Sequence, residues 1–167
     1  MGIGAPGYPS YRQILKSLAL CPVDIPTRPE DRYQPVAADV ATHRLDGLLV
    51  ASPANPTGTM LGRHELAGLA AACAEAGAAF VSDEIYHGIG YDRPAVTALE
   101  VTDDCYVINS FSKYFSMTGW RIGWMVVPPR YHDAIVTAKR ETDLGNAMLA
   151  QLVLARLFDT GEMERHL

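Results

Sequence analysis

The stretch SFSKYFSMTGWRIG, residues 110–123, is the most informative part of this chain. Two serines, Ser110 and Ser112, come just before Lys113, and Arg121 follows within the same stretch. A lysine amine can form a Schiff base with an aldehyde. Serine hydroxyls and the planar fork of an arginine can bind a phosphate group. The stretch therefore predicts a binding site for an anionic aldehyde cofactor that is held by Lys113.

Apolar runs lie on both sides of this stretch and predict strands. Gly47–Ala51 and Ala79–Ser82 are short and rich in apolar residues, which is typical of parallel strands buried on both faces. Tyr106–Asn109 leads directly into the lysine segment, and Ile122–Val127 follows it. A shorter strand is expected at Pro22–Ile25, which Pro26 closes.

Helical patterns separate these strands. Ser10–Ala19 places its apolar residues on one face, and Arg63–Glu75 is rich in alanine. Further helices are expected over Val36–Leu45 and within Arg130–Gly161. The alternation of strands and helices predicts an α/β fold, with three α/β/α layers around a mainly parallel sheet.

Polar residues follow three of the expected strands. Asn55 comes after the first buried run, Asp83 ends the second, and Ser110 to Lys113 follow the third. Open sheets of this kind bind ligands beyond the carboxyl ends of their strands. We therefore expect these residues to meet at one edge of the sheet.

Three further segments accompany the lysine stretch. They are Ser-Pro-Ala-Asn-Pro-Thr-Gly at residues 52–58, Val-Ser-Asp-Glu-Ile-Tyr at 81–86, and Pro-Gly-Tyr-Pro-Ser-Tyr at 6–11. Together with the SxSKxxxxxGxR pattern, these segments resemble those of the class I/II aminotransferases. These are pyridoxal-phosphate (PLP) enzymes of fold type I. The 52–58 and 81–86 segments precede the lysine stretch in the order that the family requires. The resemblance implies transfer of an amino group between an amino acid and a 2-oxo acid.

The resemblance also implies a role for each matching residue. Lys113 would hold PLP and move the proton between the substrate and the cofactor, while Asp83 would pair with the pyridine nitrogen. Asn55 and Tyr86 would donate hydrogen bonds to the phenolic oxygen, and Tyr8 would stack on the ring. Three residues would bind the phosphate, namely Ser110, Ser112 and Arg121.

Composition narrows the classes of partner. The formal net charge is −5, which argues against a nucleic-acid partner. The longest apolar run is far shorter than the roughly 20 residues of a membrane span. Three widely spaced cysteines without a C-x-x-C motif favour a reducing cytoplasm. The five histidines have no metal-ligand spacing, so no metal site is expected.

The resemblance covers nearly all of the chain, from about Pro6 to its end, but only part of the family's length. Residues 1–167 correspond to a central piece of the PLP-binding large domain, and the N-terminal arm and C-terminal small domain of the family are expected to be absent. In the full-length protein the resemblance implies a homodimer. Three alternatives stay open: a PLP-dependent lyase of the same fold, the aminotransferase-like effector domain of a transcription regulator, and an inactive fragment.

Overall fold

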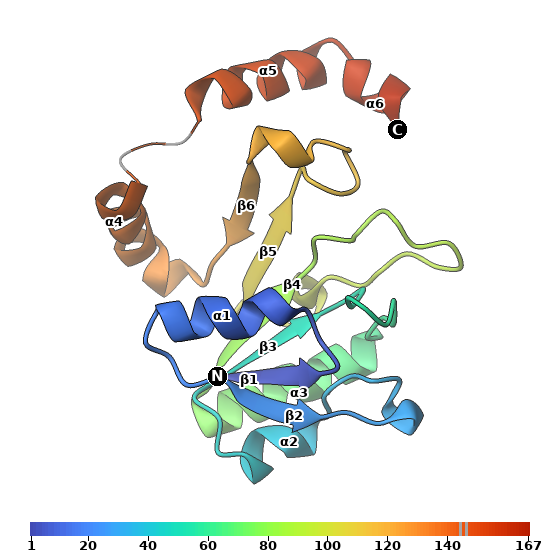
Figure 1. Cartoon of the computed structure of the whole chain (residues 1–167), viewed down its shortest axis with the longest axis vertical. Coiled ribbons are helices and arrows are strands. Elements are labelled where there is room, and N and C mark those ends of the chain that lie inside the picture. The colour runs from blue at the N-terminus through green and yellow to red at the C-terminus, as the bar shows by residue number, and fades with distance from the viewer. Residues whose placement is uncertain (144, 146) are drawn as a thin grey trace.

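The computed structural model of the chain describes residues 1–143, 145 and 147–167 (Figure 1). Six strands form one sheet in the order β2-β1-β3-β4-β5-β6. The strands are β1 Gly2–Ala5, β2 Val23–Pro26, β3 Gly47–Ala51, β4 Ala79–Asp83, β5 Tyr106–Ser110 and β6 Gly123–Val126. The α-helices are α1 Pro9–Ser17, α2 Ala37–Thr42, α3 Arg63–Ala76, α4 His132–Asp143, α5 Met148–Asp159 and α6 Glu162–His166.

Short 3-10 helices lie in the connections. They are η1 Pro29–Asp31, η2 Ala98–Glu100, η3 Thr118–Trp120 and η4 Pro129–Tyr131. Within the helical stretch that the sequence predicts over residues 130–161, Leu144 and Asn146 lie outside the described residues.

The sheet is mainly parallel, as the sequence predicts. β2, β1, β3, β4 and β5 are each parallel to their neighbours. β6 is antiparallel to β5, with Ser110 opposite Gly123. An apolar run does not reveal the direction of a strand. A parallel strand needs a crossover, usually a helix, whereas the connection from Phe111 to Ile122 holds only η3 and reverses the chain.

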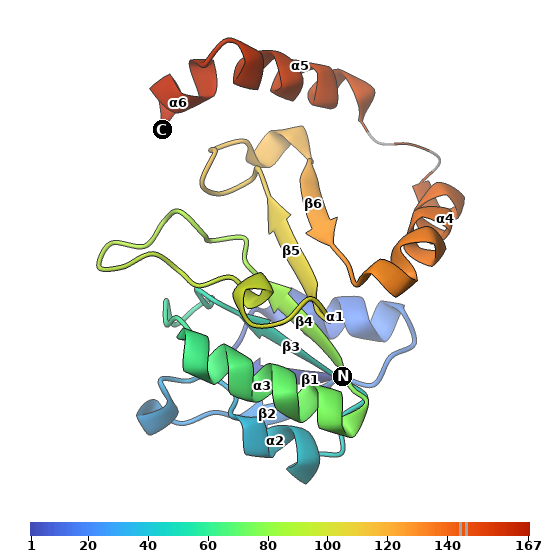
Figure 2. The same ribbon diagram turned by 180° about the vertical axis from the view of Figure 1, so that it is seen from behind.

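Helices cover both faces of the sheet, which confirms the three layers (Figures 1 and 2). α1 lies on one face, and α2 and α3 lie on the other. α3 begins where Glu65 Oε2 accepts the backbone N–H of Gly62 at 2.6 Å. It ends at Gly77, whose φ of +64° lies in the left-handed region that favours glycine.

β1 is a strand that the apolar pattern does not predict. It lies between β2 and β3, with Gly2 opposite Val23 on one side and Leu48 on the other. Two of its four residues are glycines, which weaken the strand signal. A β-carbon at Gly2 would lie 2.5 Å from Leu45 Cδ1, so a larger residue there would require the Leu45 side chain to shift.

The main core lies between the sheet and the α2–α3 layer. From α3, Leu66, Leu69 and Cys73 turn inward at helical spacing, and they meet buried strand residues such as Leu48 and Phe80. Burial raises the pKa of the Cys73 thiol to about 11. The same cause, reinforced by nearby Glu84, Asp104 and Asp103, raises the pKa of the Cys105 thiol to about 11.

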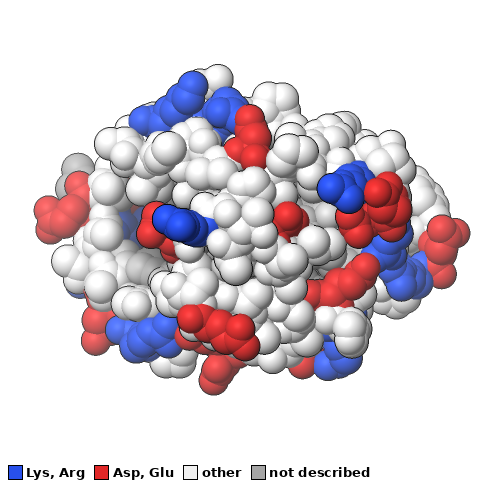
Figure 3. Space-filling view, turned by 90° about the horizontal axis from the view of Figure 1, so that it is seen from below, with Lys and Arg blue, Asp and Glu red and all other residues white. Residues whose placement is uncertain are grey.

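The helices α5 and α6 pack against the connection between β5 and β6 (Figure 1). Met117, Leu154 and Met163 form a second apolar cluster there. α5 also carries exposed apolar side chains, among them Leu149 at 74% exposure, and all four residues of β6 are exposed. On the face shown in Figure 3, basic and acidic side chains are interspersed among uncharged ones. Among the described residues, no helix is long and apolar enough to cross a membrane.

Candidate active site

Parallel strand ends bring four predicted site residues to one edge of the sheet. Asp83 ends β4 and Ser110 ends β5, while Asn55 lies in the loop after β3 and Lys113 follows β5. β3, β4 and β5 are parallel neighbours, so their carboxyl ends lie side by side. The structure therefore places these residues at the edge that their positions after strands predict.

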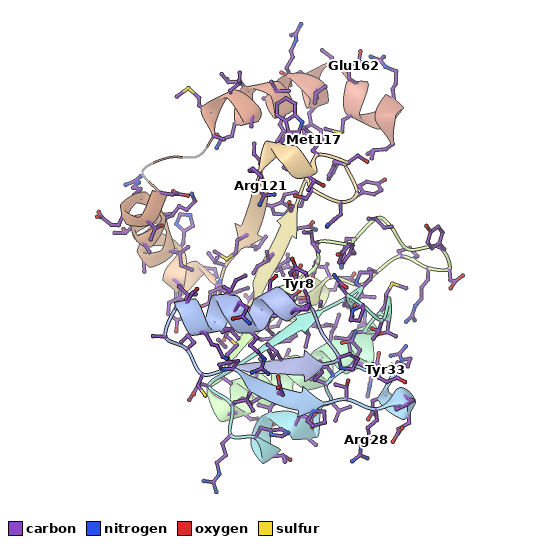
Figure 4. The ribbon with its side chains drawn as sticks, viewed as in Figure 1. Tyr8, Arg28, Tyr33, Met117, Arg121 and Glu162 are labelled. Carbon is purple, nitrogen blue, oxygen red and sulfur yellow. The ribbon has the colours of Figure 1, made fainter. Side chains whose placement is uncertain are left out.

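Arg121 reaches the same edge because β6 is antiparallel. Gly123 begins β6 and is paired with Ser110 at the end of β5, which leaves Arg121 just beyond that edge (Figure 4). Arg121 has a φ of +56°, and its Nη1 donates to the Thr118 carbonyl at 3.0 Å. A parallel β6 would have put Arg121 at the opposite edge, away from the serines.

Ser110 and Ser112 form one fixed turn. Their hydroxyl oxygens lie 2.8 Å apart, and Ser110 Oγ accepts the backbone N–H of Ser112 at 3.0 Å. Ser110 Oγ also donates to the carbonyl of Ile122 at 2.9 Å. Because Ile122 directly follows Arg121, this bond ties the serine turn to the segment that carries the guanidinium.

Asp83 has a partner that sequence reasoning missed. The Tyr11 hydroxyl donates to Asp83 Oδ2 at 2.5 Å, and the backbone N–H of Ile85 donates to Asp83 Oδ1 at 3.1 Å. Burial, followed by the charge of Asp83 and the hydrogen bond to it, raises the pKa of Tyr11 well above its ordinary value. The only signal in the sequence is the second tyrosine of Pro-Gly-Tyr-Pro-Ser-Tyr, which does not reveal its distant partner.

Tyr8 packs against Tyr11. The two rings meet edge to face, with centroids 5.4 Å apart and planes at 81°. Tyr8 lies at the start of α1 and is 42% exposed (Figure 4). Tyr11 therefore lies between the Tyr8 ring and Asp83. The Tyr8 ring packs against Tyr11 and is otherwise partly exposed, so a ligand can reach it.

Asn55, Tyr86 and Lys113 form a second group. Asn55 Nδ2 lies 3.4 Å from the Tyr86 hydroxyl, and Lys113 Nζ lies 5.8 Å from the centroid of the Tyr86 ring. Lys113 is exposed, and its amine makes no ion pair within the part of the chain that the structure describes. The lysine predicted to react is therefore accessible, beside the tyrosine predicted to bind the cofactor.

Two cavities share Asn55. One has a volume of about 420 Å³ and is lined by Asn55 and Tyr86 together with Met60, Ile89 and Tyr91. This volume falls in the range of small-molecule sites. The other cavity is small, about 30 Å³, and is bordered by Tyr8, Tyr11 and Asn55. Asn55 therefore links the tyrosine pair of α1 to the larger hollow beside Tyr86.

The sequence model of the family described as aminotransferase class I and II matches residues 3–167. The chain belongs to this family. It is 40% identical over 162 residues to a valine–pyruvate aminotransferase of Mycobacterium tuberculosis, an alignment that covers 95% of this chain and 42% of the relative. An aminotransferase structure from the same organism matches with a TM-score of 0.91 and 38% identity, over 99% of this chain and 44% of that one.

A second structure, of a Silicibacter pomeroyi protein described as an aminotransferase, matches with a TM-score of 0.89 and 58% identity. It covers 98% of this chain and 45% of the other. The chain thus spans less than half the length of each of these relatives. These matches confirm the predicted family and the predicted α/β fold.

The side chains of this aminotransferase-family chain fit PLP chemically. A carboxylate that has already accepted one hydroxyl keeps lone pairs for a protonated ring nitrogen, and Asp83 is such a group. An amide and a phenol suit a phenolic oxygen, and two hydroxyls with a guanidinium suit a phosphate. Among the residues that the structure describes, no group of histidine, cysteine, aspartate or glutamate could hold a metal ion.

Proposed function

We propose that the protein acts as a PLP-dependent aminotransferase, moving an amino group between an amino acid and a 2-oxo acid. The observation that carries this proposal is that Lys113, Asp83, Asn55 and Arg121 meet at one sheet edge in a chain of the aminotransferase family. Valine with pyruvate is the pair in the name of the M. tuberculosis relative, and we take it as the first pair to test.

In this proposal each residue has a defined task. PLP, when bound, supplies a ring that accepts electrons from the substrate's alpha carbon. The Asp83 carboxylate would hold a proton on the ring nitrogen. The Lys113 amine would hold the cofactor and would carry the proton of the substrate's alpha carbon. Asn55 Nδ2 and the Tyr86 hydroxyl donate to the phenolic oxygen.

The remaining predicted residues would orient the cofactor. Ser112 presents its hydroxyl from a turn that Ser110 fixes, which supports its binding to the phosphate. The Ser110 hydroxyl would bind the phosphate by turning its proton away from the Ile122 carbonyl. Arg121 lies on the segment tied to that turn and would add a charge-assisted contact. The part-open ring of Tyr8 would stack on the cofactor.

We further propose that the protein works as a homodimer in the cytoplasm. The exposed apolar side chains of β6 and α5 support burial against another copy, because removing apolar surface from water favours association. The free cysteines support a reducing compartment. Sedimentation velocity at several protein concentrations tests the dimer.

Covalent labelling tests the central claim. The chain is incubated with PLP, reduced with borohydride and mapped by peptide mass spectrometry, and we expect the pyridoxyl group on Lys113. Lys113→Arg keeps the positive charge but should abolish the label, while Lys16→Arg should leave it unchanged. Label on Lys16 or Lys139, or none at all, would contradict the assignment.

A further inference from the structure

Glu84 is a buried carboxylate that the proposed chemistry does not use. It is 2% exposed and follows Asp83 directly. Its Oε1 accepts the backbone N–H of Ala98 at 2.7 Å and the Ser82 hydroxyl at 3.1 Å. A charge buried to this degree requires partners on every side. His87 lies beside the second oxygen: its Nδ1 is 3.5 Å from Glu84 Oε2, a contact that is an ion pair only when the imidazole is protonated.

His87 connects Glu84 to the loop that carries Asn55. Its Nε2 lies 3.0 Å from the carbonyl oxygen of Ser52. A carbonyl can only accept, so Nε2 carries a proton, and Nδ1 donates to Glu84 only when the ring is doubly protonated. Ser52 is the first residue of this loop, and its Oγ accepts the backbone N–H of Leu61 at 2.9 Å. The imidazole therefore spans from the buried carboxylate to the base of the loop.

The imidazole is one of several anchors of the Asn55 loop. Two of its hydrogen bonds are internal, from Ala54 N–H to the Thr59 carbonyl at 2.9 Å and from Gly58 N–H to the Ala54 carbonyl at 2.7 Å. They fix the shape of the loop. At its base the Ser52 N–H donates to the carbonyl of Asp83, the last residue of β4, at 3.1 Å, and Gln34 Nε2 donates to the Thr59 carbonyl at 3.2 Å. The His87 imidazole adds a side-chain link from the segment that carries Tyr86. The contact from Asn55 to Tyr86 is long, at 3.4 Å, and cannot hold the loop by itself.

We propose that Glu84 and His87 are a positioning pair that holds the Asn55 loop opposite Tyr86. Tyr86 lies between them in the sequence, so a link from His87 to Ser52 fixes the tyrosine and the asparagine relative to each other. Neither Glu84 nor His87 touches the reacting atoms. The proposal rests on the proposed function, because the two positioned donors are those assigned to the phenolic oxygen of PLP.

Two substitutions of His87 distinguish the contact made by Nε2 from the contact made by Nδ1. His87→Gln keeps a donor near the position of Nε2 and can still reach the Ser52 carbonyl. His87→Asn keeps a donor near Nδ1, facing Glu84, and loses the link to the loop. His64→Asn, on the exposed side of α3, is the matched control. The proposal predicts a defect in His87→Asn, with rescue in His87→Gln.

Amide hydrogen exchange of the chain without cofactor is the decisive readout. In His87→Asn we expect the amides of Ser52 and Leu61, which are hydrogen-bonded at the base of the loop, to exchange about tenfold faster than in the wild type. This is the size expected for losing one hydrogen bond. The core amides of Leu66 and Leu69 should be unchanged, which distinguishes a freed loop from global unfolding. Equal exchange in the asparagine, glutamine and wild-type chains would overturn the proposal.

Two further measurements complete the test. PLP affinity, followed by absorbance, should fall in His87→Asn and recover in His87→Gln. If the wild type binds no PLP, the proposed function fails, while the exchange data still decide the role of His87. If His87→Asn does not fold, proton NMR of the wild type decides. A slowly exchanging His87 Nε2 proton near Ser52 supports the link, and a rapidly exchanging one overturns it.

Discussion

The Tyr11 hydroxyl and the Asp83 carboxylate are joined by a hydrogen bond of 2.5 Å, although the two residues lie 72 positions apart. The bond connects the first turn of α1 to the end of β4. It holds one oxygen of Asp83 while the Ile85 backbone holds the other. A carboxylate fixed on both oxygens keeps a constant direction, which a partner for a ring nitrogen requires.

Removing this hydroxyl should destabilise the fold. Tyr11→Phe keeps the packing against Tyr8 but leaves Asp83 with one partner fewer. A hydrogen bond to a charged group contributes about 1.5–3 kcal/mol, so we expect the free energy of unfolding to fall by roughly this amount at pH 7. Urea denaturation measures it. Tyr91→Phe, at a residue that is 98% exposed, should have no effect, and equal stability of both variants would refute the prediction.

Tyr11 should also make the fold sensitive to alkali. Its pKa is raised in the folded chain, so above about pH 10 the unfolded chain loses a proton that the folded chain keeps. The contribution is complete below that pH and is lost as the pH rises, by up to roughly 1.4 kcal/mol per pH unit. The stability gap between wild type and Tyr11→Phe should therefore narrow between pH 10 and 11. A constant gap would mean that Tyr11 titrates normally.

The two buried thiols do not disturb this comparison. Cys73 and Cys105 have pKa values raised from 9.0 to about 11, so they too reduce stability as the pH rises above about 9. Both are present in the wild type and in Tyr11→Phe. Their effect cancels in the difference, and only the contribution of Tyr11 remains.

Asp83→Asn should separate binding from chemistry. The amide keeps the shape of the side chain but no longer stabilises a protonated ring nitrogen. Labelling of Lys113 by PLP and borohydride should persist, whereas amino transfer from valine to bound PLP, followed by absorbance, should slow at least roughly tenfold. Asp103→Asn, at an exposed aspartate before β5, is the control and should transfer at the wild-type rate. A normal rate in Asp83→Asn would exclude Asp83 as the nitrogen partner.

The difference in burial between the apolar residues of α3 and α5 can be tested by replacing one leucine in each helix. Leu69 is 1% exposed in the main core, and Leu149 is 74% exposed on α5. Leu69→Ala should cost about 2–5 kcal/mol of unfolding free energy because it removes buried methyl groups and leaves a cavity. Leu149→Ala should change stability by less than about 0.5 kcal/mol. Comparable losses in both variants would show that α5 is buried in solution, as in a dimer.

Much of the site follows from local sequence. β3 has the predicted bounds, Gly47–Ala51. A short, continuous apolar run is typical of a strand that is buried on both faces, so its ends can be read from the sequence. Asp83 and Ser110 end strands, and the loop with Asn55 follows one, so parallel pairing suffices to bring them together. The apolar pattern of a strand is a local property of the chain, and it is the reason these positions could be predicted.

Three features were decided only by tertiary structure. β1 is half glycine, and it becomes a strand because it pairs with β2 on one side and β3 on the other. The reversal of β6, rather than any signal in its residues, brings Arg121 to the serine turn. The links from Tyr11 to Asp83 and from His87 to Ser52 join segments distant in sequence. The sequence by itself determines which side chains follow each strand, because strand formation responds to local apolar pattern. Strand direction and long-range hydrogen bonds depend on how whole elements pack, and no single segment encodes them.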